Sequence, residues 1–161
     1  MTFTPIAGLI DEHCDLMGKD TLDPDALRLH GLATTTQASR QEFDRFVAEY
    51  AAAIAAPVST ESRNSALDGI VDRMAANPVN VTLVPADWPV PEGAGLRVVP
   101  IHPVPLFPWY AAWRTGTPHA LVPLLLRAAH ASDDEPNPTG GEHWLPAGVR
   151  SPKATALGEQ R

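Results

Sequence analysis

Residues 31–88 carry the feature that most constrains the fold, because their apolar pattern alternates between strand-like and helical spacing. Between the segments typical of strands, large apolar residues recur at helical spacing, first over residues 43–54 and then over residues 67–74. Strands that alternate with helices pair in parallel through right-handed crossovers. The stretch therefore predicts a layered α/β unit whose three strands are Gly31–Thr35, Val58–Ser62 and Val81–Pro85.

Capping signals mark the ends of both expected helices. Ser39 with Glu42 forms a capping box at the start of the first helix, and Pro57 ends that helix. Ser65 with Asp68 forms a second cap ahead of the next apolar stripe. These start and stop signals agree with the apolar periodicity, so both kinds of signal predict the same helices.

Polar side chains gather where the first two strands end. Open α/β sheets bind small ligands outside the carboxyl ends of their strands, and free amides at helix N-termini attract anions. A small-ligand cleft is therefore one interpretation of these residues. Helix capping alone accounts for any single one of them and is the commoner explanation, so both interpretations stay open. The residues are Thr34, Thr35, Thr36, Gln37 and Ser39 after the first strand, and Glu61–Ser65 after the second.

The composition excludes several other classes of protein. The 161 residues carry a net charge of −7 without a cluster of Lys and Arg, which argues against a nucleic-acid-binding surface. Cys14 is the single cysteine, so the chain cannot form an internal disulfide. The N-terminus does not resemble a signal peptide, and the sequence contains no apolar run as long as a membrane helix. A cytoplasmic protein without membrane contact is expected.

Motifs that carry reaction chemistry are missing from the sequence. His13 stands beside Cys14, but no second pair occurs at ligand spacing, so a metal site is not expected. The chain lacks a Walker loop, a dinucleotide-binding glycine pattern and a nucleophile elbow, and we predict no cofactor and no catalytic residue. The best candidate for an acid–base pair is Glu61 with His102.

The first 30 residues give weaker signals. Pro5–Ile10 is apolar and is typical of an edge strand, and Asp11–Met17 is a candidate for a further strand. Asp23 followed by Pro24 predicts the capped start of a short helix.

Residues after Trp88 return to strand-like patterns before the composition changes. Leu96–Ile101 predicts a strand, and the prolines of His102–Pro105 are expected to interrupt its ladder. Leu106–Arg114 predicts an aromatic strand, and a helix is expected to open at Thr117. Residues 132–161 hold few large apolar side chains, which predicts a disordered tail in which Trp144 is incidental.

The order of these segments resembles the C-terminal part of the effector-binding domain of LysR-type transcriptional regulators. Val84-Pro85 matches the Leu-Pro-like pair that ends a strand in that family. Trp113-Arg114 and Pro118-His119 match its Trp-Arg strand end and its Pro-His-Pro-like helix start. Asp11–Met17 resembles the strand that crosses between the two lobes. The resemblance runs from Ile6 to Ala131.

The resemblance implies a periplasmic-binding-protein-like (type 2) α/β fold with one complete Rossmann-like lobe, one partial lobe and a disordered C-terminal tail. Residues 1–30 would hold the partial first lobe and the crossover strand, and residues 31–95 the complete second lobe. Residues 96–131 would supply the return strand and the closing helix of the first lobe, and residues 132–161 the tail.

The function implied by the resemblance is the binding of a small-molecule effector. Effectors in this family are often small carboxylates or aromatic acids, and a carboxylate suits helix N-termini together with Arg63. Carried over by position, the effector-facing residues are Thr35, Thr36, Ser39, Ser62, Arg63, Asn64 and Pro85.

The sequence departs from the family at its beginning, where it lacks a winged helix-turn-helix, a linker helix and the first half of lobe one. We therefore expect a truncated regulator without DNA contact, whose exposed apolar surface favours a homo- or hetero-oligomer with a LysR-type regulator. Two alternatives stay open: an interaction module that pairs with a full-length regulator through a strand edge, and a small α/β enzyme that uses Glu61 and His102.

Overall fold

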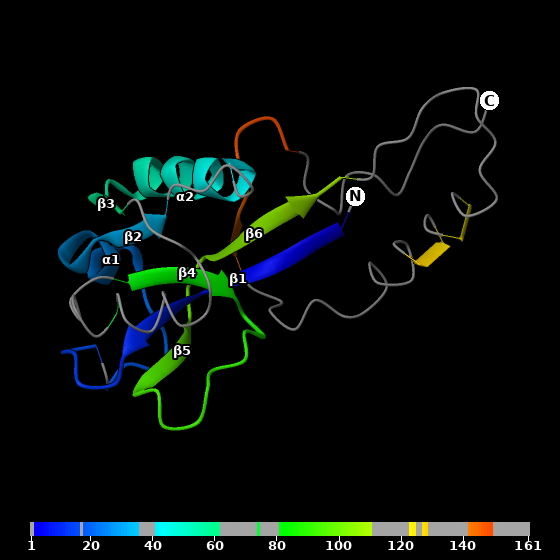
Figure 1. Ribbon diagram of the computed structural model, residues 1–161. Coiled ribbons are helices and arrows are strands. Elements are labelled where there is room, and N and C mark those ends of the chain that lie inside the picture. The colour runs from blue at the N-terminus through cyan, green and yellow to red at the C-terminus, as the bar shows by residue number, and fades with distance from the viewer. Residues whose placement is uncertain are drawn as a thin grey trace.

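The computed structural model describes residues 2–16, 18–35, 41–61, 74, 81–110, 123–124, 127–128 and 142–149. Within these ranges the strands form one seven-stranded mixed sheet in the order β3-β2-β4-β1-β6-β7, with β5 also paired to β1 (Figure 1). Among the residues that the structure describes, we find no helical segment with the length and apolar character of a transmembrane span.

The alternating unit folds as its sequence pattern predicts. β2 (Leu32–Thr35) is followed by α2 (Gln41–Ile54), β3 (Val58–Glu61) and β4 (Val81–Pro85). β2 lies between β3 and β4 and pairs in parallel with both. Met74 is helical and buried, as the second apolar stripe predicts, and the rest of that predicted helix lies outside the described residues.

β1 (Thr2–Asp11) occupies the centre of the sheet, so the prediction of an edge strand at Pro5–Ile10 is wrong. It pairs antiparallel with β4 on one side and with β5 (Leu96–Pro100) and β6 (Val104–Trp109) on the other. Gly8 permits this central position. A Cβ there would lie 2.5 Å from Leu22 Cδ1 and 2.8 Å from Val81 Cγ1, so two core side chains fill the space that it leaves.

The prediction of a strand at Asp11–Met17 is wrong, because β1 ends at Asp11 and residues 12–16 form turns. The Asp11 side chain accepts a hydrogen bond from the His13 amide at 2.7 Å, and its carbonyl accepts one from the Cys14 amide at 3.1 Å. An aspartate that bonds the backbone two residues further on reverses the chain, which ends the strand.

The start of β6 also differs from the prediction. The return strand β5 lies where Leu96–Ile101 predicts it, but Val104 and Pro105 already belong to β6. Pro105 has no amide to donate, yet the Val104 amide donates to the carbonyl of Glu142, the residue just before the new neighbour β7 (His143–Trp144). The prolines of β6 therefore do not stop it from pairing, and Pro108 also lies in its ladder with β1, opposite Phe3.

The prediction of a disordered tail is wrong for residues 142–149. His143 and Trp144 form β7, and the Trp144 ring packs T-shaped against Tyr50 of α2 with the ring centroids 5.0 Å apart. Apolar burial of one large aromatic ring offsets the cost of ordering this short segment.

Apolar side chains alternate along the strands and build a core on each face of the sheet. On β1, Ile6 and Ile10 join the larger cluster, which also contains the buried faces of α1 and α2. Leu9 points to the opposite face and packs with Met74 and Val84. The period of two along each strand produces this division.

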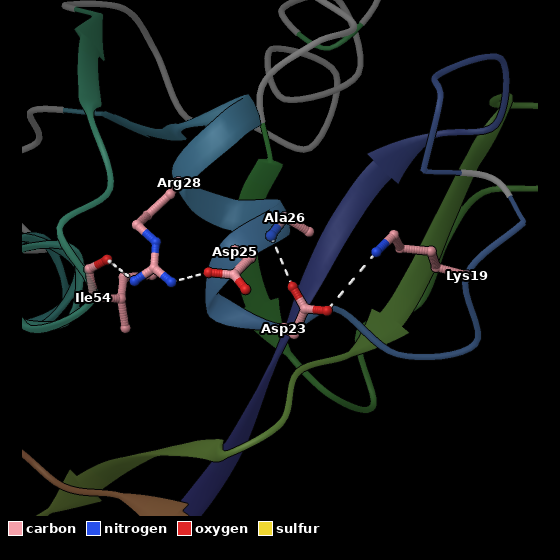
Figure 2. Close-up of polar contacts among 6 residues, drawn as sticks. All are labelled: Lys19, Asp23, Asp25, Ala26, Arg28 and Ile54. Carbon is pink, nitrogen blue, oxygen red and sulfur yellow. Dashed lines mark hydrogen bonds and ion pairs between the residues drawn. The ribbon is translucent and has the colours of Figure 1, made fainter.

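The short helix α1 (Pro24–His30) begins at its predicted cap. The Asp23 carboxylate accepts a hydrogen bond from the Ala26 amide at 2.8 Å and lies 3.8 Å from Lys19 Nζ (Figure 2). Arg28 pairs with Asp25 and donates to the Ile54 carbonyl at 3.2 Å, which ties α1 to the last turn of α2.

Candidate ligand-binding site

Three parallel strands end at one edge of the sheet. Thr35 is the last residue of β2 and lies opposite Glu61, the last residue of β3. Pro85 ends β4, which is the other neighbour of β2. The two described members of the predicted site, Thr35 and Pro85, are therefore placed at the same edge. Five other predicted residues lie outside the described part of the chain: Thr36, Ser39, Ser62, Arg63 and Asn64.

The first turn of α2 faces this edge and is already anchored to it. Thr34 Oγ1 donates a hydrogen bond to Asp44 Oδ1 at 3.0 Å. Glu42 lies in the same turn and pairs with Arg45 at 3.2 Å. Two carboxylates therefore complement the positive end of the helix dipole, which lowers the attraction of this helix start for a further anion.

β1 and β6 extend past the end of β4 (Figure 1). Ile6 lies opposite Pro85, and the Ala86 amide donates to the Pro5 carbonyl at 2.9 Å. Because β1 is antiparallel to β4, the residues before Pro5 lie beyond the end of β4. The edge is therefore a corner between the parallel strands and the β1–β6 ribbon.

The ribbon adds two groups that sequence reasoning missed. Trp109 is 56% exposed, and its indole Nε1 donates to Thr4 Oγ1 at 2.9 Å. Phe107 packs T-shaped against Trp109 with ring centroids 5.2 Å apart. No local pattern signals this contact, because Thr4 and Trp109 are 105 positions apart and meet only through the pairing of β1 with β6.

The enzyme alternative required Glu61 and His102 to meet, and the sheet keeps them apart. Glu61 ends the edge strand β3, whereas His102 follows β5, and β2, β4 and β1 lie between those strands. Four strand spacings of about 4.8 Å place the two strands roughly 19 Å apart. The backbone positions of the two residues are therefore too far apart for an acid–base pair.

Among the described residues, no group of three or more His, Cys, Asp or Glu side chains could hold a metal ion. The described polar groups at the corner are hydroxyls, an indole N–H, backbone groups and the carboxylates of α2. Such groups bind and orient a small molecule by hydrogen bonding and aromatic contact.

No protein-family model matches the chain, and no curated protein matches it. Among solved structures, the reduced form of the OxyR regulatory domain from Pseudomonas aeruginosa is similar, with a TM-score of 0.55 and 21% identity over 81% of this chain. The chain spans 61% of that domain. A full-length OxyR variant from the same organism gives a TM-score of 0.48 and 23% identity, and the match covers 65% of this chain and 33% of that one.

The likeness to the regulatory domain shows the fold, a periplasmic-binding-protein-like (type 2) α/β arrangement. In open α/β folds of this kind the ligand crevice lies outside the carboxyl ends of the strands. The corner at Thr35 and Pro85 occupies that position in this chain.

Proposed function

We propose that the chain is a small-molecule effector-binding domain of the LysR type of transcriptional regulator, acting in the cytoplasm. The observation that carries the proposal is the shared fold, which spans 81% of this chain. The corner bounded by β2, β4 and the β1–β6 ribbon supplies the place for the effector.

The effector that we propose is a small organic acid. Arg63 stands two residues after the end of β3 in the sequence, and a guanidinium binds a carboxylate through two parallel hydrogen bonds. The carboxylates of Glu42 and Asp44 complement the dipole of α2, so recognition of the acid rests on Arg63 rather than on that helix start. Thr35, Thr36, Ser39, Ser62, Asn64 and Pro85 complete the proposed site.

A thermal unfolding assay with a panel of small aliphatic and aromatic acids tests this proposal. An acid that binds only the folded chain raises the unfolding midpoint, and the rise grows with the logarithm of the acid concentration once that concentration exceeds the Kd. We expect at least one acid to do so, and we expect Arg63→Gln to abolish its effect. A flat response to the whole panel contradicts the proposal.

Arg97→Gln is the matched control for this experiment. Arg97 lies on β5 opposite Ile10, at the end of the sheet far from Pro85. Loss of one positive charge there leaves the proposed site intact, so the acid should still stabilise this variant. If both variants lose the response equally, the effect reflects net charge rather than a site.

We further propose that the domain works in an oligomer with another LysR-type regulator chain and contacts no DNA itself. The net charge of −7 supports the second part, because a DNA-binding surface requires a basic patch. Light scattering during size-exclusion chromatography measures the oligomeric state. The proposal is contradicted if the chain elutes as a monomer both by itself and when it is mixed with a full-length LysR-type regulator.

A further inference from the structure

The segment Glu142–Val149 lies against the edge of β6 and the side of α2 (Figure 1, orange). The Val104 amide donates to the Glu142 carbonyl at 3.1 Å, and β7 pairs in parallel with Val104 and Pro105. Trp144 packs T-shaped against Phe46 with ring centroids 5.5 Å apart. The segment is therefore held both by a main-chain hydrogen bond to β6 and by the packing of the Trp144 side chain against α2.

We call the edge of β6 at Val104–Pro105, together with the rings of Phe46 and Tyr50, the aromatic groove. Phe46 and Tyr50 stand one turn apart on α2, so their rings lie on the same face of the helix. They are 3% and 1% exposed with Trp144 in place. Edge pairing plus a pocket for a single side chain is the way in which sheets recognise extended peptides.

Chain connectivity does not force this contact. Parallel strands cannot be joined by a tight hairpin, and the sequence between Trp109 and Glu142 is far longer than a hairpin loop. The position of the segment is therefore set by its fit to the groove. The side-chain part of this fit consists of ring contacts. The Tyr50 hydroxyl does not add a hydrogen bond to it, because that hydroxyl is buried without a partner among the described residues.

The contact is also small enough to open. β7 has two residues, Pro105 offers no amide, and Trp144 stays only half-buried. Segments with few buried apolar contacts open at a lower free-energy cost than the rest of a domain.

From these observations we propose that the aromatic groove is a docking site for an extended, tryptophan-bearing segment, and that Glu142–Val149 is its intramolecular occupant. The segment acts as a releasable strap over α2 and β6. This inference does not depend on the effector that we propose above.

Hydrogen exchange measured by NMR on the full chain tests the strap through one amide. The bond from Val104 to Glu142 exists only while the strap is docked. In Trp144→Ala we expect Val104 to lose its protection. The amides of Leu32 and Val81, which donate to Pro57 at 2.8 Å and to Gly31 at 3.1 Å, should keep theirs. Unchanged protection of Val104 overturns the proposal.

Trp88→Ala is the control for loss of an indole, because Trp88 packs in the cluster of Leu9 and Val84 away from the groove. It should leave Val104 protected. A synthetic peptide with the sequence of residues 140–151 should restore protection to Trp144→Ala, and the same peptide with alanine in place of its tryptophan should not. Failure of the first peptide counts against a docking site.

A second form of the full chain keeps the test valid if Trp144→Ala does not fold. A protease site inserted between Thr139 and Gly140 allows the wild-type strap to be cut free after folding. The protection of Val104 should then fall on dilution. Before cutting, it should be independent of protein concentration. A rise with concentration, accompanied by a dimer in light scattering, would assign the groove to the strap of a neighbour and overturn the intramolecular occupant.

Discussion

The backbone amide of Ala86 donates a hydrogen bond to the carbonyl of Pro5 at 2.9 Å. This bond extends the pairing of Ile6 with Pro85 by one step, so the end of β4 is fixed to the middle of β1. The corner proposed as the effector site therefore rests on two rigid strands. Sites built on strands hold their geometry better than sites built on loops alone.

The central position of β1 predicts a strong response at Gly8. In Gly8→Ala the new methyl group would meet Leu22 and Val81, which are both fully buried. Overpacking of this kind costs about 1–3 kcal/mol of unfolding free energy. Chemical denaturation measures the loss. Gly18→Ala is the control, since nothing lies within 4 Å of a Cβ there, and a similar loss in both variants would contradict the packing described for β1.

The N-cap of α1 predicts a pH-dependent contribution to stability. The Ala26 amide, which donates to the Asp23 carboxylate, holds the pKa of Asp23 below its ordinary value of 3.8. The charged form is therefore favoured in the folded chain. Its contribution is present above pH 3.8 and is lost as the pH falls through the lower folded value.

Asp23→Ala should cost about 1 kcal/mol at neutral pH through loss of the cap. Asp23→Asn keeps a capping oxygen and should cost less. Urea unfolding at several pH values checks both variants. The deficit of Asp23→Ala should shrink below pH 3.8, and a deficit that stays constant down to strong acid would rule out the charged cap.

The buried hydroxyl of Tyr50 predicts an alkaline effect. Burial raises the pKa of Tyr50 to about 12 from 10.0, so the neutral form is favoured in the folded chain. Stability from this group is fully present below pH 10 and is lost as the pH rises through about 12. Tyr50→Phe should be nearly neutral at pH 7, because the hydroxyl has no partner among the described residues.

Unfolding curves between pH 9 and pH 11 distinguish this prediction from a general alkaline effect, since that interval spans the ordinary tyrosine value of 10.0. Tyr50→Phe should flatten the decline of stability with pH. Tyr110→Phe, at a side chain that is 66% exposed, should retain it. Equal slopes in the two variants would exclude Tyr50 as the source.

The bond from Thr34 to Asp44 predicts a link between the start of α2 and the proposed site. Thr34→Val keeps the side-chain shape but removes the donor, and it should cost roughly 1–2 kcal/mol because the acceptor is charged. Thr34→Ser keeps the hydroxyl and should retain most of the stability. Calorimetric unfolding compares the two. If Thr34→Val and Thr34→Ser behave alike, the hydrogen bond does not anchor the helix.

The sequence predicted the parts of the fold that are encoded locally. The spacing of Phe43, Phe46 and Tyr50, with Pro57 behind them, predicts α2, and the apolar run at Val81–Pro85 predicts β4. Parallel pairing of β2 with its two neighbours follows from the alternation of elements. The edge position of Thr35 and Pro85 follows from the same rule.

Sequence patterns did not predict the contacts between segments that are far apart in the chain. Gly8 weakens the apolar signal of β1, although it is the residue that fits the strand between Leu22 and Val81. Trp144 stands in a stretch of low apolar content, and its burial is favoured by contacts with the rings of Phe46 and Tyr50. These contacts join segments that are remote in the sequence, so local periodicity carries no trace of them.

An NMR titration of the labelled chain with an acid that raises the thermal midpoint tests the central claim most directly. The account predicts concentration-dependent shifts confined to the corner, at the amides of Thr35 and Ala86 and at the indole of Trp109. The amide of Arg97, at the far end of the sheet, should stay unchanged. Shifts centred on Arg97, or no shifts in the corner at a saturating concentration of that acid, would contradict it.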